Sequence, residues 1–212
     1  EMCIRDRKSY MAIFEVCVGN YKEAVLAAKR GADRIELCDN LLEDGTTPSY
    51  GTIKMTIEKL NIPVMVIIRP RGGDFYYTDD ELEIMKSDIE MCKNLGAYGV
   101  VIGAIKDNKI DYRIIKDLVN VAKPMSITFH MAFDEIEDKK SAIDYLVELG
   151  GDRILTKGGK ENAIEGMKCL KELVEYSNGK ILIMPGKGIN KENRDMILEY
   201  TKAIEIHGSK IL

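Results

Sequence analysis

Eight short apolar segments recur along the 212-residue chain, and stretches with helical spacing separate them. The apolar segments lie at residues 13–19, 34–39, 63–70, 99–105, 125–133, 153–158, 180–186 and 203–208. The stretches between them include 21–31, 49–60, 78–96 and 141–151, whose apolar residues recur every three or four positions. Strands that alternate with helices pair in parallel through right-handed crossovers, so eight such units predict a (β/α)8 TIM barrel.

The alternative fold is a doubly wound sheet, which commonly has five or six strands. A faint repeat favours the barrel, because KRGADRIELCD (29–39) resembles ELGGDRILTKG (148–158) four units later. The sequence ends four residues after Gly208, so we expect the eighth helix to be absent or truncated. We expect a single TIM-barrel domain over residues 11–212. Residues 1–10 are expected to be a non-native or disordered tail, since EMCIRDR resembles a translated sequencing adaptor.

Charge and cysteine usage narrow the class of function. The 31 Lys and Arg are outnumbered by 35 Asp and Glu, which argues against nucleic-acid binding. No segment approaches the roughly 20 apolar residues that span a bilayer, so we expect no membrane partner. The five cysteines lack CxxC spacing, which is typical of free thiols, and we expect a cytoplasmic location. The oligomeric state stays open, and a homo-oligomer is compatible with this fold.

Within each apolar segment the polar side chains occupy alternate positions, which we call one parity, so they face the same side of the strand. They lie near the strand ends, where such barrels have their active sites. They are Glu15, Cys17, Glu36, Cys38, Arg69, Thr128, His130, Thr156, Glu205 and His207. We expect Arg69 to lie among Glu15 and Glu36 and to neutralise them, because unpaired carboxylates are costly to bury.

Two interpretations of this polar set stay open. It is either a structural ion-pair network that fills the barrel or a pocket that binds a ligand. The candidate catalytic pocket consists of Glu15, Glu36, Arg69, His130 and His207. In such a pocket a carboxylate or imidazole serves as general acid or base, and the guanidinium holds a small anionic, perhaps phosphorylated, metabolite.

Cys17 and Cys38 belong to neighbouring strands, so their sulfur atoms can approach each other. Buried free cysteines usually act as small apolar residues, which is one interpretation. The other is a metal site, because two thiolates suit a soft ion such as Cu(I). No organic cofactor is indicated.

The loops after the strands add candidate ligand-binding residues. They combine cations, acids, a hydroxyl and glycines, which allow close approach to a ligand, and phosphate often binds at such loops. They are Arg71, Asp74, Asp134, Thr156, Lys157, Gly186 and Gly188.

Seven sequence motifs together resemble the CutC family of copper homeostasis proteins. They are FEVCV, GADRIELC, EDGTTPSYG, IIRPRGGDF, TFHMAFD, RILTKG and IMPGKGI. The resemblance covers about residues 12–210. It implies a (β/α)8 barrel and a role in cytosolic copper handling. It also implies Cu(I) ligands at Cys17 and Cys38.

The resemblance further implies a polar pocket at the barrel mouth. Its residues would be Glu15, Glu36, Arg69, His130 and His207. Two positions depart from the family pattern, since Met131 replaces a frequent arginine and Asp44 replaces a frequent glycine.

Overall fold

The computed structural model describes residues 12–212, and the expected N-terminal tail lies outside this range. Eight parallel strands form a nearly closed barrel in the order β10-β1-β2-β3-β4-β7-β8-β9. Their bounds are β1 Ile13–Val18, β2 Arg34–Leu37, β3 Val64–Ile67, β4 Gly99–Ile102, β7 Ser126–Phe129, β8 Arg153–Thr156, β9 Leu182–Pro185 and β10 Glu205–Gly208. The predicted TIM-barrel fold is therefore confirmed.

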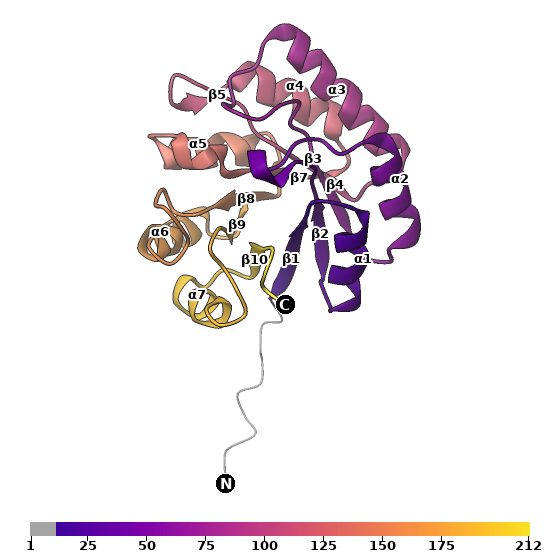
Figure 1. Cartoon of the computed structure of the whole chain (residues 1–212). Helices are drawn as coiled ribbons and strands as arrows, with labels where there is room; N and C mark the ends of the chain where they lie inside the picture. The colour runs from indigo at the N-terminus through magenta and orange to yellow at the C-terminus, as the bar shows by residue number, and fades with distance from the viewer. Residues whose placement is uncertain (1–11) are drawn as a thin grey trace.

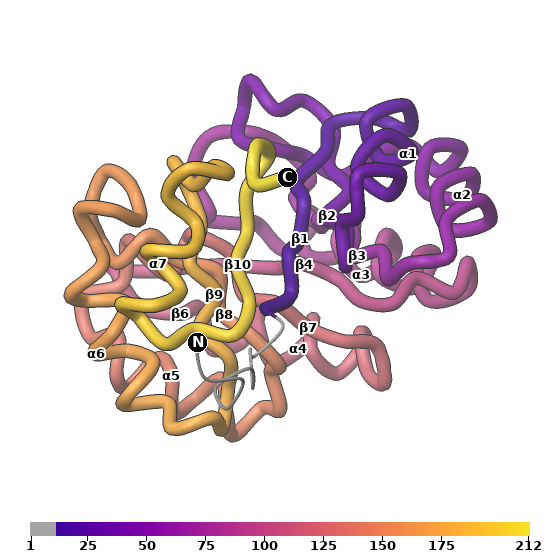
Figure 2. The backbone as a smooth tube through the Cα atoms, turned by 90° about the horizontal axis from the view of Figure 1, so that it is seen from below, coloured from indigo at the N-terminus to yellow at the C-terminus, as the bar shows by residue number. Residues whose placement is uncertain are grey.

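Seven α-helices occur within the described residues and surround the strands (Figures 1 and 2). Their bounds are α1 Tyr21–Lys29, α2 Tyr50–Lys59, α3 Asp79–Asn94, α4 Tyr112–Ala122, α5 Lys139–Glu148, α6 Met167–Ser177 and α7 Arg194–Thr201. Two short 3-10 helices, η1 (Leu41–Glu43) and η2 (Met131–Glu135), follow β2 and β7. Side-chain caps begin helices α1 to α5, whereas α6 and α7 have none within residues 12–212. Thr78 and Glu81, for example, form the reciprocal capping box of α3.

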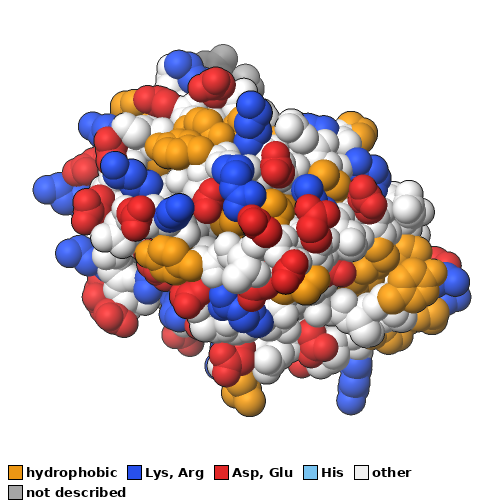
Figure 3. All heavy atoms as spheres, turned by 90° about the horizontal axis from the view of Figure 1, so that it is seen from above, with side chains coloured by type: hydrophobic (Ala, Val, Ile, Leu, Met, Phe, Trp, Pro, Cys, Tyr) orange, Lys and Arg blue, Asp and Glu red, His pale blue; other side chains and the backbone are white. Residues whose placement is uncertain are grey.

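The apolar core has two parts. The larger lies between the barrel and the helices, as in other α/β folds. The smaller lies inside the barrel and joins Cys38, Met65, Ile67 and Val101, with Cys17 packed against it. Side chains of alternating strand residues thus fill the barrel interior. On the outer surface, cationic and anionic side chains are interspersed over the face that Figure 3 shows.

Every barrel strand is shorter than its predicted apolar segment, and the chain forms one hairpin that was not predicted. The hairpin consists of β5 (Ile105–Lys106) and β6 (Lys109–Ile110), joined by Asp107 and Asn108 at positive φ of 51° and 55°. These dihedrals are those of a two-residue hairpin turn that favours Asp and Asn. The Asp-Asn pair was therefore a usable sequence signal for this hairpin.

Strand register brings three polar residues side by side. Glu15 on β1 pairs with Arg34 on β2 and with His207 on β10. Cys17, two residues further along β1, pairs with Glu36. Because side chains alternate along a strand, these residues share the barrel interior. We call the end of the barrel at the carboxyl ends of the strands its mouth, and the opposite end its floor.

Candidate functional site

Four buried charged residues, Glu15, Arg34, Arg153 and Glu205, form a network that we call the floor cluster. The Arg34 guanidinium binds the Glu15 carboxylate and lies 2.5 Å from Glu205 Oε2. Arg153 Nε lies 2.9 Å from the same Glu205 oxygen. Burial alone would raise the pKa of Glu15, but His207 and Arg34 lower it to about 2. The acids of the floor cluster are therefore compensated by two arginines of β2 and β8.

This arrangement corrects the expectation for Arg69, which makes no contact with Glu15 or Glu36 in the described part of the chain. Arg34 binds Glu15 in its place and shares Glu205 with Arg153, whereas Glu36 lies next to His207. The sequence repeat carried this signal, because ADRIEL and GDRILT place Arg34 and Arg153 at equivalent positions. Each follows an aspartate that accepts a backbone N–H from a neighbouring strand, Phe14 for Asp33 and Ile127 for Asp152.

His207 connects the floor cluster to the mouth. Its Nδ1 lies 2.9 Å from Glu15 Oε1, and its Nε2 lies 3.4 Å from Glu36 Oε2. Burial alone would lower the pKa of His207, but Glu36, Cys17 and Glu15 together raise it well above its ordinary value. An imidazolium that donates to the Glu15 carboxylate is the arrangement that this shift favours.

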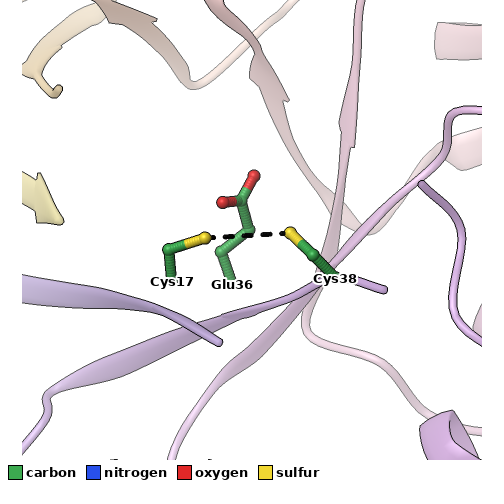
Figure 4. Close-up of side chains that lie close together, drawn as sticks. All are labelled: Cys17, Glu36 and Cys38. Atoms are coloured by element: carbon green, nitrogen blue, oxygen red, sulfur yellow. Dashed lines mark hydrogen bonds between the residues drawn. The ribbon is translucent and has the colours of Figure 1, made fainter. Parts of the chain in front are cut away.

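Cys17 and Cys38 point toward each other from adjacent strands, with the Glu36 carboxylate beside them (Figure 4). The two Sγ atoms are 3.9 Å apart, and both lie within 4.8 Å of a Glu36 oxygen. Their hydrogen bond lowers the pKa of the Cys17 thiol well below its ordinary value and raises that of Cys38. Burial and the charge on Cys17 raise the pKa of Glu36. The pair therefore favours one thiolate that is hydrogen-bonded by one thiol.

Arg69 follows β3 and binds loops instead of acids. It donates to the backbone oxygens of Glu43, Gly45 (2.8 Å) and Gly73 (2.7 Å). Its guanidinium carbon lies 5.0 Å from the centre of the Phe75 ring. Arg69 thus ties the loop after β2 to the loop after β3 at the mouth.

His130 follows β7 and caps η2, where its Nδ1 accepts a hydrogen bond from the backbone N–H of Ala132 (3.1 Å). Burial, together with the charge of Arg69, lowers its pKa to about 3. The ring lies so close to Gly103 that a Cβ there would come within 2.3 Å of it. Glycine at position 103 therefore makes room for a neutral, fixed imidazole.

The candidate loop residues divide into two groups. Arg71 and Asp74 form a partly exposed ion-pair cluster with Glu81, at Arg71–Glu81 and Arg71–Asp74 distances of 2.5 Å and 3.2 Å. Asp134 instead lies at the mouth, where it accepts hydrogen bonds from Thr156 Oγ1 (2.7 Å) and the backbone N–H of Lys157 (3.1 Å).

The expected inward parity of Thr156 is wrong. Arg153 and Leu155 are the β8 residues that reach the barrel interior and its cavity, so Thr156 belongs to the opposite parity. Two glycines also have steric roles: a Cβ at Gly186 would come within 2.5 Å of Leu155, and Gly188 has a φ of 75°.

A cavity of about 1070 Å³ opens at the mouth. Among the candidate residues, its lining includes Cys17, Glu36, Arg69, His130, Asp134, Lys157, Gly188 and His207. Glu15 and Cys38 lie beneath this lining, whereas Arg71, Asp74, Thr156 and Gly186 do not contribute to it. The structure thus brings the thiol pair, the two histidines and Arg69 to one cavity.

Comparison with known proteins agrees with these motifs. The CutC family model matches residues 12–212. The copper homeostasis protein cutC homolog of Homo sapiens is 46% identical over 198 residues, which cover 93% of this chain and 72% of the human protein. A family protein CutC of Enterococcus faecalis is 44% identical over 208 residues, covering 94% of this chain and all of that protein.

Solved structures give the same result. The crystal structure of CutC from Streptococcus agalactiae has a TM-score of 0.91 and 42% identity, and the match covers 95% of this chain and 100% of that one. Deoxyribose phosphate aldolase from Aeropyrum pernix, at 15% identity and a TM-score of 0.71, shares only the fold. The family match, the relatives and the shared structure show that this chain belongs to the CutC family.

Proposed function

We propose that the protein binds Cu(I) between Cys17 and Cys38 and takes part in copper homeostasis. The observation that carries this proposal is the 3.9 Å separation of the two sulfur atoms. With metal–thiolate bonds of about 2.3 Å, a bridging ion would have an S–metal–S angle of about 115°. That geometry leaves a third position open, so the ion can be received and released.

The chemistry of the surrounding groups supports a soft monovalent ion. Thiolates select Cu(I), whereas the carboxylate of Glu36 is a harder ligand that suits Cu(I) poorly. Glu36 therefore flanks the ion, and the protonated His207 compensates the negative charge of a bis-thiolate complex. Cys17 lines the cavity while Cys38 is only 1% exposed, so an ion would reach the pair through the mouth.

Titration of reduced protein with Cu(I) against a competing chelator tests the proposal. We expect one tightly bound equivalent in the wild type and its loss in the Cys17→Ser/Cys38→Ser variant. The matched control is Cys92→Ser/Cys169→Ser, whose thiols lie on α3 and α6. Cys3 is present in every variant and contributes equally. Equal stoichiometry and affinity in the wild type and the Cys17→Ser/Cys38→Ser variant would refute the proposal. If the wild type bound Zn²⁺ more tightly than Cu(I), Zn²⁺ would be the ion of this site.

The second candidate function is catalysis on a small anionic metabolite. The observation that favours it is His207, which is hydrogen-bonded to Glu15 and lies 3.4 Å from Glu36 at the bottom of an open cavity. Such an imidazole can move a proton between a carboxylate and a ligand. An unbiased metabolite-binding screen on wild type and His207→Gln tests this function. Ligands whose binding survives the substitution unchanged would argue against a role for His207.

A further inference from the structure

Arg69 is a buried cation without an acidic partner. Its side chain belongs to a residue that is only 4% exposed, and no ion pair joins it to an acid within residues 12–212. Arg34 and Arg153, which are equally buried, each bind Glu205. Because a buried charge is costly unless compensated, the carbonyl oxygens around Arg69 leave part of its charge available to a further anion.

Hydrogen bonding at Arg69 is also incomplete. Backbone carbonyls accept three hydrogen bonds from its two terminal nitrogens, but the buried Nε–H has no hydrogen-bond partner in the part of the chain that the structure describes. Buried donors without partners are rare and require an explanation, such as a missing ligand. Arg69 lines the mouth cavity, so a ligand there can supply the acceptor.

His130 contributes a second donor of the same kind. Its Nδ1 accepts from Ala132, so the proton of the neutral ring resides on Nε2. That buried Nε2–H has no hydrogen-bond partner among the described residues, and His130 also lines the cavity. The Phe75 ring, which Arg69 covers, lies 4.9 Å from the His130 ring, centre to centre. Both free donors therefore flank one aromatic ring in one cavity.

We propose that Arg69 and His130 form a binding site for a small oxyanion, either a carboxylate or a phosphate group. Oxygen atoms of the ligand would accept hydrogen bonds from Arg69 Nε–H and His130 Nε2–H, and the negative charge of the ligand would neutralise that of Arg69. Phe75 supplies an apolar wall beside them. The site deepens the second candidate function and rests on it for the class of ligand, but its test requires neither bound metal nor turnover.

The outer lining of the cavity does not select anions by itself. Lysines and acids both occur there: Asp44, Asp134, Glu135, Lys157, Lys160, Glu161, Glu165, Lys187 and Lys210. The pairing of Lys187 with Asp44 at 3.9 Å shows that these signs partly cancel. Selectivity for an oxyanion therefore comes from Arg69 and His130, which are buried, whereas the lysines of the lining are half-buried or exposed.

The test measures the thermal unfolding of reduced, metal-free protein in phosphate, sulfate, acetate or chloride at matched ionic strength. We expect Tm of the wild type to rise in at least one oxyanion relative to chloride. Because sulfate and phosphate stabilise folded proteins generally, only the part of the rise that Arg69→Met or His130→Phe removes reports the site. Such a rise in phosphate and sulfate identifies a phosphate-type ligand, and such a rise in acetate identifies a carboxylate. Arg69→Met and His130→Phe should each weaken the apparent anion affinity at least about tenfold, because each loses a buried hydrogen bond to a charged ligand.

The matched control is Arg194→Met. Arg194 also has a buried Nε without a hydrogen bond among the described residues, and it covers an aromatic ring, Phe14 at 4.6 Å. Unlike Arg69, it has an acid nearby, Asp195 Oδ1 at 3.6 Å from Nε, and it does not line the cavity. Its variant should keep the anion effect, as should Cys17→Ser/Cys38→Ser, which separates this site from the metal proposal. If Arg69→Met does not fold, His130→Phe gives the same test. No oxyanion effect in the wild type, or an effect that survives in His130→Phe, would overturn the proposal.

Discussion

Three arginines are almost equally buried in this barrel, but their surroundings differ between its two ends. At the floor, Arg34 and Arg153 bind the carboxylates of Glu15 and Glu205. At the mouth, the Arg69 guanidinium donates only to backbone carbonyl oxygens among residues 12–212, and it covers Phe75. An arginine whose charge the protein itself compensates has a structural role. One whose charge is left partly uncompensated beside a cavity is available to a ligand.

The largest effect should come from Arg34→Met. This change leaves Glu15 buried without its arginine, and breaking a buried ion pair in this way costs about 3–5 kcal/mol. Chemical denaturation at neutral pH measures the loss in the free energy of unfolding. The control is Arg113→Met, which removes an exposed ion pair with Asp79 and should change stability little. A loss in Arg34→Met as small as in that control would mean that the floor cluster is not structural.

Arg69→Met should destabilise the protein less, by about 2 kcal/mol or less. It removes hydrogen bonds to carbonyls that line or border a cavity, where water can replace the guanidinium, and it leaves no carboxylate unpaired. The same denaturation experiment compares it with Arg34→Met. If the two losses are equal, the distinction between floor and mouth fails, and Arg69 is a structural residue as well.

The two histidines extend the comparison, because their environments shift the pKa in opposite directions. His130 at the mouth has a pKa lowered from 6.5 to about 3, whereas that of His207, next to Glu15, is raised. Between about pH 6.5 and pH 3 the unfolded chain binds a proton at residue 130 that the native ring does not. The stability due to neutral His130 is therefore complete above about pH 6.5 and is lost as the pH falls.

His130→Phe should consequently flatten the pH dependence of stability in that range. The wild-type free energy of unfolding should fall by up to about 1.4 kcal/mol more per pH unit than that of the variant. Denaturation curves at several pH values measure this difference, and acids elsewhere affect both proteins alike. Parallel pH profiles would show that native His130 takes up a proton as readily as the unfolded chain.

Much of the fold followed from the sequence because alternating strands and helices leave few topologies. The approach of Cys17 to Cys38 followed as well, since neighbouring parallel strands place residues of one parity side by side. Strand parity failed in β8, where Arg153 and Thr156 are both polar but lie on opposite faces: Arg153 faces the interior, and the hydroxyl of Thr156 binds Asp134.

The partner of Arg69 could not be predicted from residue types. An arginine side chain at a strand end can reach inward to an acid or sideways to loop carbonyls. Every residue has a backbone carbonyl oxygen, so the sequence does not show which of them accept a hydrogen bond. Arg34 and Arg153 begin their strands, so they looked like boundary residues. Their position in the repeat, after an aspartate and before an apolar run, was the available signal.

The smallest effect should come from Arg71→Met, which separates the two arginines of the RPR sequence. Arg71 is partly exposed, and its ion pairs with Glu81 and Asp74 belong to the surface of the loop after β3. Exposed pairs contribute at most about 1 kcal/mol, so we expect a loss below that value. Because Arg71 does not line the cavity, the oxyanion effect on Tm should also persist in this variant. Loss of that effect would show that Arg71 takes part in the site. The loop after β3 would then have to rearrange when an anion binds, and the proposed contacts of Arg69 require no such rearrangement.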